Sequence, residues 1–210
     1  MKKSSILTIA IIFVIRISSI NAQTASTFTD LRDGQTYPTI KIDNQTWFAK
    51  NLNYKTSSSW CYDNSNANSN IYGRLYTWDA SLKACPRGWH LPSDDEWKTL
   101  EMALGMGQSD ADDKGWRGTD EGDKIKETGF THWYSSNTGS TNSSGFTALP
   151  GGYRTSNGLF RGLVHLGHWW SSTEASGTRT WRRHLYDDKG KVYRSSSSKS
   201  YGYSVRCLKD

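Results

Sequence analysis

The chain has 210 residues and a formal charge of +6, and three of its bases lie within the first 16 positions. The remaining charge of +3 argues against nucleic acid as the main partner. Ten Trp and eleven Tyr stand beside many Ser, Asn and Gly, whereas Leu, Ile and Val are sparse after the leader. Aromatic rings must therefore supply most of the buried area, which excludes a mainly aliphatic core.

Residues 1–22 have the pattern of a secretory signal peptide. Two lysines precede an apolar run over residues 6–17, and Ala22 is the small residue of a cleavage site. The run is too short for a membrane anchor and contains Arg16. We expect a secreted, periplasmic or cell-surface protein with no membrane insertion after leader removal. Its three cysteines fit one disulfide with one cysteine left over.

The first part of the mature chain is expected to hold a hairpin between two irregular segments. Residues 23–32 are polar without a period and predict a flexible lead. Residues 34–53 alternate isoleucine with polar residues, and Asp43–Asn44 tolerates the positive φ angles of a tight turn. Residues 55–71 are rich in Asn and predict a long polar loop.

The stretch from residue 76 to residue 100 predicts two short helices with a sharp break. Trp78, Leu82 and Cys85 are spaced to share one helical face. Pro86 cannot continue that helix. A buried first helix carrying a cysteine is therefore expected just before the break.

The second helix has clear signals at both ends. Ser93 is a good N-cap, and Glu96 three residues later completes a capping box. Trp97 and Leu104 continue a buried face, and Gly105 stands where a glycine C-cap belongs. The cap, the charge pattern and the period all predict a helix here.

The second half of the chain changes from loops to strands. Residues 106–130 are a glycine- and aspartate-rich connection with a weak helical turn near residues 124–128, and residues 132–145 predict a surface loop. From residue 146 onward, strand patterns alternate with turns; one hairpin spans residues 179–195 across a turn at 187–190, and a last strand covers 201–208. Early helices and a late meander indicate an α+β domain.

Several blocks resemble a known family in their order along the chain. They are DGQTYPTIKIDNQTWFAKNLNY, CYDN with YGRLYTWDA, CPRGWHLPSDDEW, GGYR, WWSST and GYSVRC. Together they resemble the Fibrobacter succinogenes major paralogous domain over residues 33–210. The resemblance implies a C-type-lectin-like fold, with two short helices, a small twisted antiparallel sheet and long loops.

The resemblance also implies a role for each cysteine. In the lectin-like fold the first-helix cysteine bridges to the last strand, which maps onto Cys85 and Cys207. The family often has a further cysteine where this chain has Ser69, so Cys61 is expected to be unpaired. Cys61 could instead be a nucleophile, but Trp60, Tyr62 and Asp63 offer no positive charge to activate it.

Metal sites are considered and not favoured. His165 and His168, with His184 downstream, lack the helical spacing of a zinc site. Asp110, Asp112 and Asp113 resemble part of a calcium loop but lack the later bidentate glutamate. The calcium signatures of carbohydrate-binding lectins are also absent, so no cofactor is expected.

Catalytic motifs are not found, and an enzyme is not expected. There is no G-x-S-x-G motif, no phosphate-binding loop and no recognisable pair of carboxylates. Formylglycine-generating enzymes share the broad lectin-like fold and depend on cysteines near the C-terminal end. Cys207 alone stands there, and the resemblance assigns it to a structural bridge.

The candidate ligand-binding face lies on the late hairpin. Alternation places Arg182, His184 and Tyr186 on one face of the strand, opposite the face of Trp181, Arg183 and Leu185. Exposed Tyr and Arg are typical of binding hot spots, whereas most late tryptophans are expected in the core. The candidate set is Arg182, His184, Tyr186, Tyr193 and Arg194.

These observations predict an exported, monomeric, non-catalytic module that binds a glycan or a protein outside the cell. An enzyme related to the formylglycine-generating enzymes is one alternative. A structural surface protein that assembles with itself is another.

Overall fold

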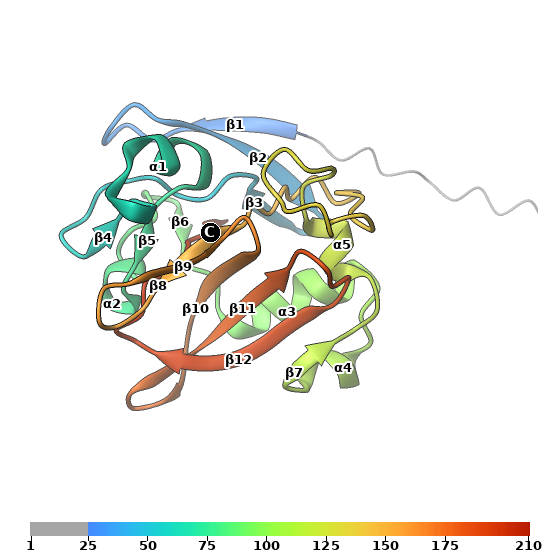
Figure 1. Cartoon of the computed structure of the whole chain (residues 1–210). Helices are drawn as coiled ribbons and strands as arrows, with labels where there is room; N and C mark the ends of the chain where they lie inside the picture. The colour runs from blue at the N-terminus through green and yellow to red at the C-terminus, as the bar shows by residue number, and fades with distance from the viewer. Residues whose placement is uncertain (1–24) are drawn as a thin grey trace, which may run out of the picture.

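The computed structural model describes residues 25–210, so the predicted signal peptide lies outside the described residues. The described chain is a mixed α/β structure with few helices and curled antiparallel sheets (Figure 1). Within it, no helix is long and apolar enough to cross a membrane.

The five-stranded sheet joins both ends of the described chain. Its strand order is β1 (Ala25–Thr29), β2 (Thr36–Ile42), β3 (Gln45–Phe48), β13 (Leu208–Lys209) and β6 (Trp89–His90). β2 and β3 form the predicted hairpin, and Asp43 in its turn has a φ of 52°. Within the described residues 25–32 the predicted flexible lead is wrong, because β1 pairs with β2 along its whole length; residues 23 and 24 lie outside the described residues. Ladder hydrogen bonds use backbone groups, so a polar segment without a period can still complete a sheet edge.

The six-stranded sheet carries the late hairpin. Its strand order is β7 (Gly115–Arg117), β12 (Val192–Ser198), β11 (Arg179–Tyr186), β10 (Leu166–Ser176), β8 (Gly151–Arg154) and β9 (Phe160–Leu163). β11 and β12 form the hairpin predicted across residues 187–190. All neighbours are antiparallel except β10 and β8. The last strand predicted over 201–208 is reduced to isolated bridges and β13.

Two segments predicted as irregular contain regular structure. Residues 55–71 hold β4 (Ser59–Trp60), the 3₁₀ turn η1 (Tyr62–Asn64) and most of α1 (Asn66–Tyr72); β4 pairs with β5 (Leu75–Tyr76). The connection over 106–130 holds α4 (Gln108–Asp112), β7 and α5 (Glu121–Ile125), and α5 overlaps the helical turn predicted near residues 124–128. These elements are only two to seven residues long, and contacts with distant segments, rather than a local period, stabilise them.

The predicted helix pair is present, but its first member is shorter than expected. α2 (Trp78–Ser81) ends before Leu82, whose side chain is 42 % exposed rather than buried. α3 (Asp94–Ala103) begins with the predicted capping box of Ser93 and Glu96, and Gly105 follows it with a φ of 115°. The prediction was better for α3 because caps act locally.

Aromatic rings fill the core, as the composition predicts. One cluster lies between the first sheet, α3 and the large sheet, and it includes Trp47, Trp97, Phe146 and Trp169. A second cluster includes Tyr37, Phe48, Trp170 and Tyr203. The disulfide that the resemblance implies joins Cys85, just after α2, to Cys207, just before β13. It ties the segment that follows α2 to the five-stranded sheet, which contains β13.

Candidate functional site

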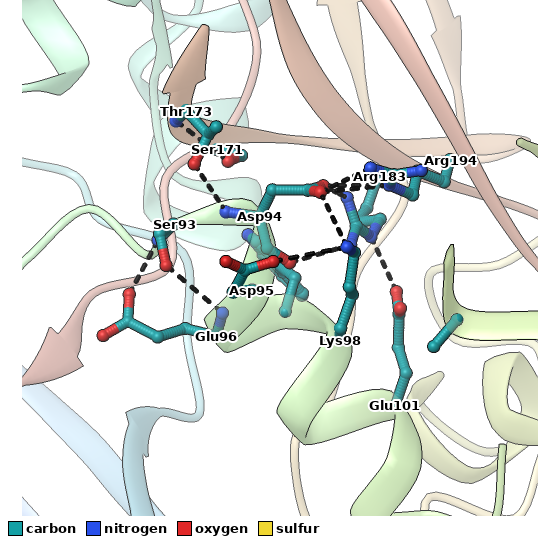
Figure 2. A network of polar contacts seen from close by, with 12 residues as sticks. Ser93, Asp94, Asp95, Glu96, Lys98, Glu101, Ser171, Thr173, Arg183 and Arg194 are labelled. Carbon is teal, nitrogen blue, oxygen red and sulfur yellow. Dashed lines mark hydrogen bonds and ion pairs between the residues drawn. The ribbon is translucent and has the colours of Figure 1, made fainter. Parts of the chain in front are cut away.

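The inner face of the β11–β12 hairpin lies against α3 and is held by ion pairs. Arg183 Nη1 lies 2.5 Å from Asp94 Oδ1, and Arg183 Nε lies 2.7 Å from Glu101 Oε1. Arg194 Nη2 lies 2.6 Å from Asp94 Oδ2, and Arg117 Nη2 reaches Glu101 Oε1 at 2.8 Å. Figure 2 shows the carboxylate of Asp94 turned toward the guanidinium groups of Arg183 and Arg194. Three arginines from the sheet therefore share two carboxylates from one helix.

This network has the properties of a structural ion cluster. Burial by itself raises the pKa of Asp94, but the hydrogen bonds and charges of Arg194 and Arg183 outweigh burial and lower the pKa to about 2. Asp94 therefore stays ionised at any physiological pH. Asp94 is also the first residue of α3, where the helix dipole favours a negative charge.

Arg194 is wrongly placed in the predicted binding set. It is only 5 % exposed, and its guanidinium lies 3.8 Å from the ring centre of Trp181 and bonds to Asp94. The register explains this, because Arg194 pairs directly opposite Arg183, and opposed residues of a ladder share a face. The predicted turn at 187–190 already implies that register, so the inward position of Arg194 could have been derived from the sequence.

The outer face of the same hairpin carries the rest of the predicted set. Tyr193 pairs opposite His184, and Trp116 of β7 pairs opposite Tyr193. Tyr186 ends β11 beside them and is 37 % exposed. Trp116 was missed by sequence reasoning, because β7 has three residues inside a connection that shows no strand pattern.

Four rings meet on this outer face around a shallow hollow. The Trp116 ring centre lies 5.0 Å from that of Tyr193, 5.4 Å from that of His184 and 5.5 Å from that of Tyr186, with each pair edge-on. His184 and Tyr193 stack at 4.2 Å. The hollow has a volume of about 410 Å³, and Asp188 and Lys189 of the hairpin turn complete its rim. Below, this place is called the aromatic hollow.

Arg182 lies behind the aromatic hollow, between two histidines. Its Nη1 donates to His184 Nδ1 at 2.5 Å and to His168 Nδ1 at 2.9 Å. Both imidazoles therefore carry their proton on Nε2. Burial, and then the positive charge of Arg182, lower the pKa of His184 to about 3. Burial, and then the charges of Arg182 and His184, hold the pKa of His168 well below its usual value of 6.5.

The ring contacts continue from the histidines across the sheet. His168 stacks on Tyr203 at 5.0 Å between ring centres, and Tyr153 lies edge-on to His168 at 4.8 Å. Arg182 lies over the Tyr203 ring at 5.5 Å. A row of aromatic and imidazole rings thus crosses the large sheet from β7 to β8.

A buried lysine holds the hairpin turn that forms the rim. Lys126 Nζ donates to the backbone carbonyls of Tyr186, Asp187 and Lys189 at 3.0–3.2 Å. It also lies 3.1 Å from Asp123 Oδ1. Four oxygens around one ammonium fix the backbone of the turn, so Asp188 and Lys189 project from a rigid support.

The environment of the unpaired cysteine differs from the sequence argument. Cys61 is free and buried, as the resemblance implies. The expectation that no positive group neighbours it is wrong, because Arg74 Nη1 lies 3.0 Å from Cys61 Sγ. Pairing of β4 with β5 brings these two residues together from 13 positions apart.

The residues considered for metals do not converge. Nδ1 of His165 bonds to Asp187 at 2.9 Å, whereas His168 bonds to Arg182. Asp112 bonds to Lys98 at 2.8 Å rather than facing a shared centre with its acidic neighbours. Within residues 25–210, no group of three or more His, Cys, Asp or Glu side chains could hold a metal ion.

Comparison with known proteins places the chain in a family. Searches of the curated proteins and of the solved structures find no match. The model of the family described as Fibrobacter succinogenes major domain matches residues 40–209, which is most of the chain. The protein therefore belongs to the Fibrobacter succinogenes major domain family.

Proposed function

We propose that this protein is an exported, monomeric, non-catalytic binding module that recognises a glycan or protein ligand outside the cell. The observation that carries the proposal is the aromatic hollow, where four rings gather on an outer sheet face. Tyr186 remains 37 % exposed there, although most large aromatic side chains of the described chain lie in its core.

The chemistry of the aromatic hollow favours a glycan over a protein. Its volume of about 410 Å³ suits a small ligand unit rather than a broad protein contact. The C–H bonds of a sugar ring carry partial positive charge and pack against the negative faces of Trp and Tyr rings. Asp188 and Lys189 at the rim supply an acceptor and a donor for sugar hydroxyl groups.

We propose that the fold is C-type-lectin-like. Support comes from the Cys85–Cys207 disulfide, which joins the segment between α2 and α3 to the residue before the last strand. Further support comes from the late β11–β12 hairpin, which displays the aromatic hollow on its outer face. In such an arrangement the core serves as a scaffold, and the hairpin and its turn carry the ligand.

Two alternatives remain as outcomes of specific tests. An enzyme related to the formylglycine-generating enzymes needs a reactive cysteine near the C-terminal end, and Cys207 is buried within a disulfide. Mass spectrometry that detects a free, reactive Cys207 would favour the enzyme. A self-assembling surface protein would sediment as concentration-dependent oligomers without any added ligand.

The direct test is a glycan and surface-protein array probed with three forms of the mature protein. The wild type should bind a subset of glycans, and Tyr186→Ala should lose about tenfold or more in affinity, because it removes an exposed ring of the aromatic hollow. Tyr134→Ala is the matched control, since Tyr134 is 54 % exposed and lies outside the aromatic hollow. Equal binding by all three forms would exclude this face, and binding to proteins alone would exclude the glycan.

A further inference from the structure

The arginines of the β11–β12 hairpin differ in how their charges are neutralised. On the inner face, Arg183 and Arg194 each have a carboxylate partner. On the outer face, Arg182 forms no ion pair with any carboxylate in residues 25–210; its guanidinium donates to the neutral imidazoles of His168 and His184 and lies over the Tyr203 ring. Its buried Nε also has no hydrogen-bond partner. A positive charge without a counterion therefore lies directly behind the aromatic hollow.

The positive charge of Arg182 affects the aromatic hollow by polarising the imidazole of His184. Arg182 donates to Nδ1, so the Nε2 atom of His184 carries the proton. His184 lines the hollow, and its Nε2–H donates no hydrogen bond to any group in residues 25–210. A cation that donates to one nitrogen of an imidazole draws electron density from the ring and strengthens the other N–H as a donor.

The remaining charges near the aromatic hollow do not cancel that of Arg182. At the rim, Lys189 Nζ lies 3.2 Å from Asp188 Oδ2, so these two exposed groups balance each other. Asp187 is turned away and bonds to His165 and Ser136. The floor of the hollow thus offers a polarised donor backed by an unbalanced positive charge.

Resting on the proposed function, we infer that the aromatic hollow selects an acidic saccharide, one with a carboxylate on the sugar ring. The carboxylate accepts the Nε2–H of His184, and the ring packs against Trp116, Tyr186 and Tyr193. Arg182 acts behind His184 as a positioning residue that supplies the charge. A sulfate ester on a sugar would offer the same charge with a different geometry.

The experiment uses matched saccharide pairs on the same array, followed by titration calorimetry of the best binders. Each pair is a uronic-acid oligosaccharide and its methyl ester, which keeps the ring and removes the charge; sulfated oligosaccharides form a third arm. The wild type should prefer the acid by about tenfold, as expected for a hydrogen bond to a charged group. Arg182→Gln should abolish that preference, so that the acid and its methyl ester bind the variant with equal affinity.

Two further variants separate a charge effect from misfolding. Lys189→Gln removes an exposed charge at the rim and should reduce the acid preference only a few-fold, because Lys189 is already balanced by Asp188. Arg161→Gln removes an exposed arginine away from the aromatic hollow and should change nothing.

The outcomes distinguish this inference from the proposed function. Equal or better binding of the esters would overturn the acidic preference and leave glycan binding in place. A preference for the sulfated arm over the uronic acids would overturn the carboxylate assignment. No binding to any glycan would overturn both.

Discussion

The two faces of the β11–β12 hairpin place similar residues in opposite situations. Arg182 and Arg183 are neighbours in sequence, yet Arg183 is enclosed by Asp94 and Glu101 while Arg182 meets two neutral histidines. The inner face uses its charges to hold α3 against the sheet (Figure 2). On the outer face, the charge of Arg182 has no carboxylate partner within residues 25–210, and the rings of the aromatic hollow line an open surface. Residue type alone therefore does not distinguish a structural arginine from one available to a ligand. The groups that each guanidinium contacts make that distinction.

The largest expected effect comes from breaking the inner face. Asp94→Ala would leave Arg183 and Arg194 without their shared carboxylate, and unpaired buried charges of this kind typically destabilise a protein by about 3–5 kcal/mol. The free energy of unfolding from urea titration measures this. Asp95→Ala is the matched control, because the Asp95 side chain is 90 % exposed, and it should change stability by less than about 0.5 kcal/mol. Similar values for both variants would show that the network contributes little.

Acidification should act on the outer face through its neutral histidines. The pKa of His184 is about 3 in the folded protein, below the usual value of 6.5 that applies when it is unfolded. At a pH between these two pKa values, His184 is protonated in the unfolded chain but not in the folded protein. The free energy of unfolding therefore falls as the pH drops below 6.5. The loss is at most about 1.4 kcal/mol per pH unit for this histidine.

His184→Gln isolates that contribution. All other titrating groups are common to the two proteins, so the difference in unfolding free energy between pH 7 and pH 5 reports His184 alone. Wild type should lose about 2 kcal/mol more than the variant over that range. Parallel stability curves would mean that His184 is readily protonated in the folded state.

The sequence determined the inner scaffold better than the outer site. The capping box of Ser93 and Glu96 predicted α3, because a cap depends on residues within one turn. Trp116 could not be predicted, because the strand that presents it exists only through pairing with β12. The same holds for Arg74 beside Cys61 and for Lys126 beneath the hairpin turn, which tertiary contacts bring together.

Of the two wrong predictions for Arg194 and β1, only that for Arg194 could have been avoided. Arg194 could have been assigned to the inner face from the predicted turn length, because that length places it opposite Arg183. The strand β1 could not have been predicted from the sequence, because its polar residues show no alternation and backbone pairing with β2 orders it. Patterns along the chain thus predicted which residues alternate, whereas the register between strands decided which of them meet.

The smallest expected effect on stability accompanies the most informative change in binding. Arg182→Gln should alter the free energy of unfolding by less than about 1 kcal/mol, because Arg182 has no ion-pair partner among residues 25–210 to lose and glutamine can still donate to one histidine.

If the outer face of the hairpin binds a ligand through the unpaired charge of Arg182, then calorimetric titration of Arg182→Gln with the best acidic saccharide of the array must show a loss of affinity. The variant should be as stable as the wild type and should bind the saccharide about tenfold more weakly. Unchanged affinity in a stable variant would contradict this role of Arg182.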